Sequence, residues 1–287
     1  MSKGTDPLEV MAVSPHARRT RGALRAWTAL LLAFLWLPIV FLVLFSFEDS
    51  KTVGFPIPGF TLDWYRGLPT NGPLMSAVEN SILVALFTAF IGSIVGTMAA
   101  FVLVRAGLRF PNGARILVTM PIMFPGVLIG LALLIFLAGI FHIRLGLGTV
   151  VAGHLVLTVP FVILIVAARL QGFDRRLEWA AADLGASPAR TLRHIVLPLI
   201  APAILAGALI SITLSIDEFV VTFFTVGPQL TLPIYIYTQV KIGVTPEVNA
   251  VATLMLIGTV LLLGAVTLVA SQGRRAARAL RARLTAA

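Results

Sequence analysis

The most regular set of polar side chains in this apolar sequence lies between residues 211 and 225. Spacings of 4, 3, 4 and 3 place five of them on one face of a helix. These five, which we call the polar stripe, are Ser211, Ser215, Glu218, Thr222 and Thr225. Asp217 lies on the neighbouring flank of the same helix. A carboxylate in hydrocarbon costs a few kcal/mol or more unless it is paired, protonated or hydrated, so the stripe is expected to face a cavity or a partner.

The polar stripe and Asp217 are therefore predicted to line a path for a polar solute. The stretch from Pro202 to Asp217 corresponds to about 22 Å of helix, which places the acids in the outer half of a membrane. The alternative is that these groups pair with another subunit only for assembly. No catalytic or metal site is predicted, because His154 and the carboxylates are dispersed along the chain rather than convergent.

A second segment with clear local signals runs from residue 174 to residue 198. Asp174 can cap a first helix, Gly185 supplies a left-handed stop, and Ser187 followed by Pro188 begins a second helix. Each helix has one apolar face, formed by Leu177, Ala180, Ala181 and Leu184 in the first and by Leu192, Ile195, Val196 and Leu199 in the second. Small residues at the corner would let another surface approach the backbone. This pattern indicates one of two roles: the segment contacts a protein partner, or it lies on a membrane surface as an amphipathic hairpin.

The composition defines the class of protein that must hold these two segments. Of the 287 residues, 58% are hydrophobic and 12% are charged, and the mean hydropathy is +0.98, which excludes a soluble globular protein. The sequence predicts an all-α, polytopic membrane protein embedded in the lipid bilayer. The formal charge of +10 does not indicate nucleic-acid binding, because the basic residues are spread over short segments between hydrophobic blocks. Cysteine is absent, which excludes disulfides and thiol chemistry.

Six blocks are apolar and long enough to span a bilayer as helices. They cover residues 27–47, 80–104, 116–141, 145–168, a fifth block from about 199–202 through 217–218, and 248–273. The chain is thus expected to comprise a basic cytoplasmic arm (1–26), a six-helix domain (27–273) and a basic cytoplasmic tail (274–287). Gly92 and Gly96 are expected to permit close helix packing within the chain. His154, alone in the fourth block, is expected to be a hydrogen-bonded structural residue rather than a proton relay.

The distribution of basic residues predicts the orientation of the chain. If six helices alternate across the membrane, Lys51, Arg66, Arg144 and Lys241 lie on one side and the other 18 of the 22 lysines and arginines lie on the opposite side. Basic residues collect on the cytoplasmic side of membrane proteins. Both termini and the 174–198 segment are therefore predicted to be cytoplasmic.

The 174–198 segment resembles the EAA loop of the inner-membrane permeases of ABC importers. The residues that carry this resemblance are Gly185, Ile195, Leu197 and Pro198, preceded by an acidic, alanine-rich stretch. The resemblance implies that the segment docks in a groove of a cytoplasmic ATPase. It assigns to that coupling loop Glu178, Ala180, Ala181, Asp183, Leu184, Gly185, Ala186, Ile195, Leu197 and Pro198. This chain departs from the family pattern at the usual glutamate position, which holds Trp179, while Glu178 lies one residue earlier.

Three further segments resemble the permeases of spermidine/putrescine-type importers, and most of all the second of their two permeases. They are SIDEFVVTFFTVGP at 215–228, LPIYIYTQVKIGVTPEVNA at 232–250 and FTLDWYRGL at 60–68. The resemblance implies a six-helix type I importer permease in the bacterial inner membrane. Its implied partners are a second permease subunit, two cytoplasmic ABC ATPase subunits and an extracytoplasmic solute-binding protein.

The chain itself is not predicted to be an enzyme or to hold a cofactor. A phosphate-binding loop needs Gly-Lys, and Lys3, Lys51 and Lys241 follow Ser2, Ser50 and Val240 instead. ATP must then be hydrolysed by a partner, whose motion would reach the fifth helix through the coupling loop and produce alternating access. Import of another small organic solute, an ion-driven secondary transporter and a membrane-embedded enzyme remain as alternatives.

Overall fold

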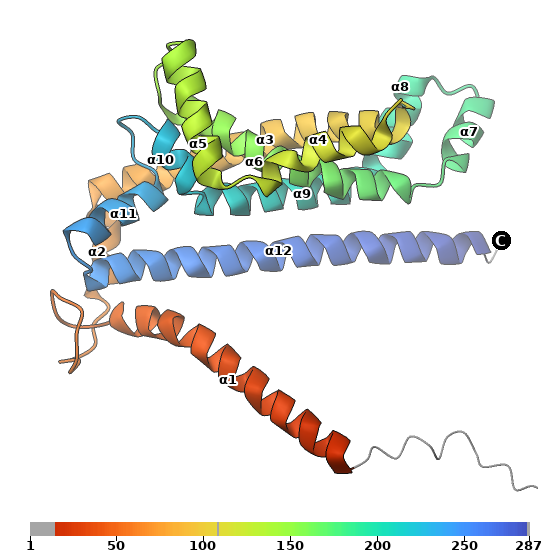
Figure 1. The fold of residues 1–287 in the computed structure, drawn as a ribbon. Coiled ribbons are helices and arrows are strands. Elements are labelled where there is room, and N and C mark those ends of the chain that lie inside the picture. The colour runs from red at the N-terminus through yellow and green to blue at the C-terminus, as the bar shows by residue number, and fades with distance from the viewer. Residues whose placement is uncertain (1–14, 108, 286–287) are drawn as a thin grey trace, which may run out of the picture.

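The computed structural model describes residues 15–107 and 109–285, and this part of the chain is almost entirely helical (Figure 1). In chain order, the helices begin with α1 (Pro15–Phe45), α2 (Asp63–Gly67), η2 (Leu68–Thr70), α3 (Gly72–Arg105), α4 (Pro111–Met123), α5 (Gly126–Leu134), η3 (Ile135–Ile140) and α6 (Leu147–Gln171). Those that follow are α7 (Arg176–Asp183), α8 (Pro188–Thr191), η4 (Leu192–Val196), α9 (Leu197–Asp217), α10 (Val220–Thr225), α11 (Leu232–Ile242) and α12 (Pro246–Thr285). The prediction of an all-α membrane protein is confirmed.

Helices α3, α6 and α9 form the packed centre of the molecule. Their shared core contains Ala100, Val162, Val166 and Ile200, which are almost completely buried. A Cβ atom added at Gly96 would lie 2.7 Å from the Val162 side chain, so the absence of a side chain sets the spacing of α3 and α6. The expectation that this pair of glycines serves packing within the chain is confirmed.

Five helices of the described chain are long and apolar enough to cross a membrane, and a sixth span results if α4 and the helix from Gly126 to Ile140 count as one. These two pieces meet at an angle of 93°. The span expected at residues 116–141 is therefore bent and made of two helical pieces, not one continuous helix. Pro125 causes the break, because it has no N–H for the helical ladder and forces Phe124 into an extended conformation (ψ 140°).

The fifth span is also broken, at the polar stripe. Helix α9 ends at Asp217, Glu218 is extended (ψ 102°), and α10 begins at Val220. The continuous helix expected through residues 211–225 is therefore wrong. The break is stabilised locally, because the Glu218 carboxylate accepts the Val221 N–H at 2.9 Å and so caps α10.

The helix–corner–helix expected over residues 174–198 is confirmed. Gly185 has φ +78° between α7 and α8, the Asp174 carboxylate accepts the Arg176 N–H, and the Ser187 hydroxyl accepts the Arg190 N–H. The second helix runs through η4 directly into α9. In Figure 1 this corner and the C-terminal end of α12 lie at one end of the bundle, and α2 and α11 lie at the other.

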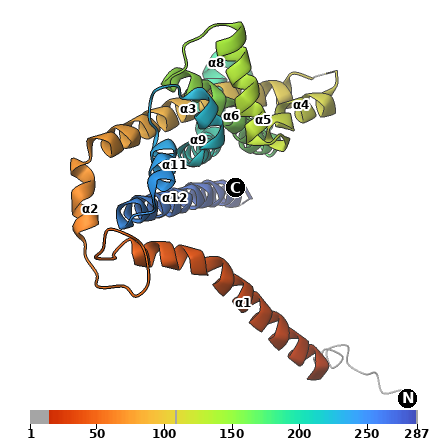
Figure 2. The ribbon, with the colours of Figure 1, turned by 60° about the vertical axis from the view of Figure 1, so that its left-hand side comes forward.

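Helix α1 diverges from the bundle and approaches α12 only near its own C-terminal end (Figures 1 and 2). Residues 22–38 of this helix are exposed, and none of residues 22–45 is buried by the rest of the described chain. The expected arm (1–26) lies partly outside the described residues and partly within α1. The expected tail (274–287) continues α12 as far as Thr285.

Candidate functional site

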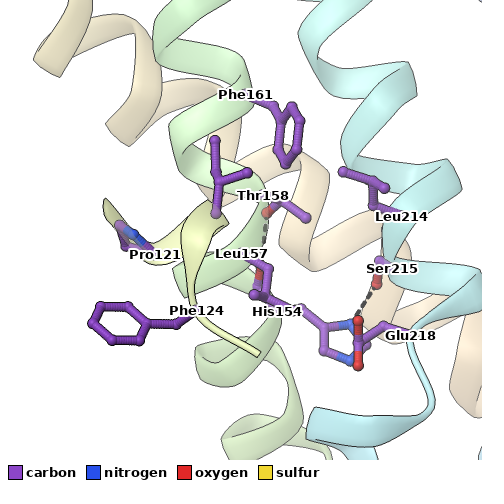
Figure 3. A pocket seen from close by; sticks show the side chains of 10 residues that line it. Pro121, Phe124, His154, Leu157, Thr158, Phe161, Leu214, Ser215 and Glu218 are labelled. Atoms are coloured by element: carbon purple, nitrogen blue, oxygen red, sulfur yellow. Dashed lines mark hydrogen bonds between the residues drawn. The ribbon is translucent and has the colours of Figure 1, made fainter. Parts of the chain in front are cut away.

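A cavity of about 170 Å³ lies where the two broken spans face α6 (Figure 3). It is lined by Pro121, Ile122 and Phe124 at the first break, His154, Leu157, Thr158 and Phe161 on α6, and Leu214, Ser215 and Glu218 at the second break. Most of these side chains are apolar. A few convergent polar groups in an otherwise apolar pocket are the usual arrangement of a small-molecule site.

The breaks bring two helix C-termini to this cavity. Helix α4 ends beside Pro121 and Phe124, and α9 ends beside Ser215 and Glu218. The C-terminus of a helix carries unpaired carbonyl groups and a partial negative charge. The carboxylate of Glu218 lies at the same place. The helices that follow the breaks, α5 and α10, begin at the same two places with N-termini of opposite partial charge, so the Glu218 carboxylate is the group that favours a positively charged occupant.

His154 connects α6 to both sides of the second break. Its imidazole is almost completely buried, with Nδ1 2.7 Å from the Ser215 hydroxyl before the break and Nε2 2.7 Å from the Thr222 hydroxyl after it (Figure 3 shows the first of these contacts). The expectation that His154 is a hydrogen-bonded structural residue agrees with these contacts. Its position at the cavity was not expected, and no signal in the fourth span indicated it.

The other members of the predicted solute path point elsewhere. Thr225 is buried and donates to the Val221 carbonyl, and the Ser211 hydroxyl is buried without a hydrogen-bond partner in the described chain. Asp217 is exposed on the side of α12, where it accepts from Thr259 at 3.4 Å. Of the six residues, the structure brings Ser215 and Glu218 to the cavity wall, and it places Thr222 one hydrogen bond behind it.

At the opposite end of α9, the coupling loop is tied to α3. The Glu178 carboxylate forms a two-pronged ion pair with Arg105, whose guanidinium also lies over the rings of Phe101 and Phe173 at 5.2 and 5.6 Å. Trp179, at the family's glutamate position, is 63% exposed. Glu178 therefore faces the end of α3, and Trp179 faces outward.

Most of the remaining coupling-loop residues form an open surface. Leu184 is 88% exposed, and Ala180, Asp183, Gly185 and Pro198 are also exposed, whereas Ala181 is buried. Leu197 is half-buried, and Ala186 and Ile195 line a shallow cavity of about 260 Å³ together with Arg190, Thr191 and His194. No group of three or more metal-ligand side chains occurs within residues 15–107 and 109–285.

The broken apolar spans, the cavity with its few polar groups and the exposed helical corner together indicate a transport permease. Residues 90–281 match the family described as binding-protein-dependent transport system inner membrane component, and the chain belongs to this family. It is a multi-pass protein of the bacterial inner membrane and a permease subunit of an ABC importer.

Two relatives of the chain are permeases of Escherichia coli K12. The chain is 40% identical over 229 residues to the spermidine/putrescine transport system permease protein PotC. This match covers 78% of this chain and 85% of PotC. The chain is 39% identical over 230 residues to the putrescine transport system permease protein PotI, with 78% and 82% covered.

A solved structure supports the fold alone. A chain of a bacterial ABC transporter involved in the import of the acidic polysaccharide alginate superposes with a TM-score of 0.70 at 15% identity, over 88% of this chain and 97% of that one. The expected type I permease fold is confirmed.

Proposed function

We propose that this chain forms half of the translocation path for a polyamine of the spermidine or putrescine type. The observation that carries the proposal is the Glu218 carboxylate at the wall of a cavity where two helix C-termini meet. A carboxylate stabilises a cation in a medium where an unpaired charge is expensive. The relatives at 40% and 39% identity, which are named for spermidine and putrescine transport, support the same class of solute.

We infer three kinds of partner for this permease: a second permease, two cytoplasmic ATPases and an extracytoplasmic binding protein. The 174–198 corner is the surface that would meet an ATPase, with Trp179 and Leu184 as its most exposed apolar side chains. Because α8 passes through η4 into α9, a displacement of the corner would reach the cavity without crossing a flexible loop. Both chain termini would lie on the ATPase side, and the end of α12, which lies at the same end of the bundle as the corner, supports this orientation (Figure 1).

The experiment is uptake of radiolabelled putrescine and spermidine by cells that produce the chain with its partner subunits. Glu218→Gln removes the charge while keeping the size of the side chain, and we expect uptake to fall by tenfold or more, since a hydrogen bond between charged groups contributes about 1.5–3 kcal/mol. Glu79→Gln is the matched control, because Glu79 is an exposed carboxylate of α3 away from the cavity.

Three outcomes would contradict the proposal. Wild-type cells that take up neither amine would exclude the solute class. Loss of the assembled complex in Glu218→Gln would assign this residue to assembly instead of the path. Uptake that survives ATP depletion but stops when the proton gradient is dissipated would indicate a secondary transporter.

A further inference from the structure

The hydroxyl groups around the cavity have little freedom to donate hydrogen bonds, because each has only one hydrogen. Thr158 donates its hydrogen to the His154 carbonyl at 2.9 Å. Thr222 donates its hydrogen to the Glu218 carbonyl at 2.6 Å. A carbonyl oxygen can only accept, so both hydrogens are committed to the backbone.

These hydroxyl-to-carbonyl hydrogen bonds determine the tautomer of His154. Since the Thr222 hydrogen is already used, the 2.7 Å contact with Nε2 requires the imidazole to donate there. Both ring nitrogens are bonded to hydroxyls, and a charged imidazole at this buried position would lack a carboxylate hydrogen-bonded to it, so the ring is neutral. A neutral imidazole has one N–H, and Nδ1 must therefore accept the hydrogen of Ser215.

The polar side chains of the cavity wall are consequently acceptors toward its interior. Ser215 donates its hydrogen to His154 Nδ1 and Thr158 donates its hydrogen to the His154 carbonyl, so both hydroxyls offer only lone pairs to the cavity. Glu218 uses Oε1 to cap α10, and no hydrogen bond of the described chain engages Oε2.

We propose that this acceptor-only wall binds one primary ammonium group, with Glu218 as its counter-charge and His154 as the positioning residue that keeps Ser215 an acceptor. The proposal rests on the proposed function and deepens it. An alkylammonium group has three N–H donors and no acceptor, which matches the wall. A carboxylate or phosphate brings only acceptors and would be repelled.

The size of the cavity indicates how much of a solute it can hold. A cavity of about 150 Å³ accommodates benzene, so 170 Å³ corresponds to about six non-hydrogen atoms. That is the size of 1,4-diaminobutane or of one end of a longer polyamine. The apolar side chains of Leu157, Phe161 and Leu214 would pack against its methylene groups.

The test is equilibrium binding of radiolabelled 1,4-diaminobutane to the assembled complex in lipid nanodiscs, without a binding protein. In His154→Gln the amide can accept from Ser215 and donate to Thr222, so we expect the Kd to stay within about threefold of the wild type. In His154→Leu the Ser215 hydrogen is free to turn into the cavity, and we expect the Kd to rise by tenfold or more. Butylamine should compete with the diamine, and butanoate should not.

Thr213→Ala is the matched control for loss of a hydroxyl, because Thr213 lies on α9 but donates to the Leu209 carbonyl and does not line the cavity. If His154→Leu prevents assembly, Ser215→Ala tests the same wall with a smaller change, and we expect its Kd to rise at least threefold. If His154→Leu assembles and binds the diamine with the wild-type Kd, the proposal is wrong. If only Ser215→Ala assembles, a wild-type Kd in that variant has the same meaning. Competition by butanoate would also overturn the proposal. Diamine uptake by cells without diamine binding to the complex would overturn this inference and leave the proposed function standing.

Discussion

The guanidinium of Arg105 and the carboxylate of Glu178 are joined by two hydrogen bonds of 2.9 and 2.6 Å across 73 residues of sequence. About a fifth of each side chain is exposed, so the pair is partly shielded from water. It ties the first helix of the corner to the end of α3. The corner is thus attached to the bundle by this ion pair in addition to the two chain connections, from α6 into α7 and from α8 into α9.

The first prediction concerns this ion pair. Arg105→Ala is expected to release α7 and weaken the attachment by about 1–2 kcal/mol, because a bidentate charged pair that is partly buried is worth more than a surface pair. The measurement is the number of ATP molecules hydrolysed per solute imported by the assembled complex, which should increase. Arg109→Ala, at a nearby exposed position, should leave this ratio unchanged. An unchanged ratio in Arg105→Ala would show that the tether has no part in coupling.

The second prediction concerns the corner itself. Gly185 has a left-handed backbone and open space at its Cβ position, and Asp adopts that conformation with a strain of about 1–2 kcal/mol, so Gly185→Asp should keep the fold. If an ATPase docks closely on the corner, the new charged side chain should reduce co-purification of the ATPase by tenfold or more. Gly107→Asp is the matched control, since Gly107 is also left-handed (φ +60°) with open space. Full retention of ATPase and uptake in Gly185→Asp would contradict the coupling role.

The third prediction concerns the contact between α3 and α6. Gly96→Ala would place a methyl group 2.7 Å from Val162, and it is expected to lower the free energy of unfolding by about 1–3 kcal/mol through overpacking. Thermal unfolding of the purified complex measures the effect. Gly258→Ala on α12 meets no neighbouring atom and should be neutral or slightly stabilising. Equal stability of the two variants would show that the helices can separate at no cost.

The fourth prediction concerns alkaline pH at the α2–α11 end of the bundle. Burial raises the pKa of the Tyr235 hydroxyl, the hydrogen bond from Asn71 opposes this, and the charge of Glu247 adds to it. The folded protein therefore binds the proton more tightly than the unfolded chain, and stability should fall as the pH rises from about 10, the ordinary tyrosine pKa, through the raised value. Tyr235→Phe should flatten this loss in pH-dependent unfolding curves. An unchanged alkaline slope in that variant would exclude Tyr235 as its source.

The corner could be predicted because its signals are local. Capping residues, a glycine and a proline act within a few residues of the bonds they control, and Asp174, Gly185 and Ser187 behave as expected. The partner of Glu178 could not be predicted, because Arg105 comes near it only through packing of α3 against α6.

The two helix breaks differ in whether the sequence contains a local signal for them. Pro125 was a local signal for the first, since the residue before a proline avoids the helical conformation. The hydropathy pattern gave no indication of this first break, because a bent span is as apolar as a straight one. The second break contains neither glycine nor proline, and it depends on the capping carboxylate of Glu218 and on His154 from another helix. Periodicity therefore placed Ser215 and Glu218 together correctly but extended the helix too far.

The short segments beyond the breaks, α5 and α10, lie against each other so closely that a Cβ atom at Gly130 would be 2.6 Å from the Phe224 ring. Both segments also pack against α6, since a Cβ atom at Gly153 would lie 2.7 Å from Val221 and 3.3 Å from Leu133. The Thr149 hydroxyl of α6 donates a further hydrogen bond to the Thr225 carbonyl of α10. The cavity wall at the two breaks is therefore supported from behind by three mutually packed helices, so the site is preorganised and a solute would pay little to shape it.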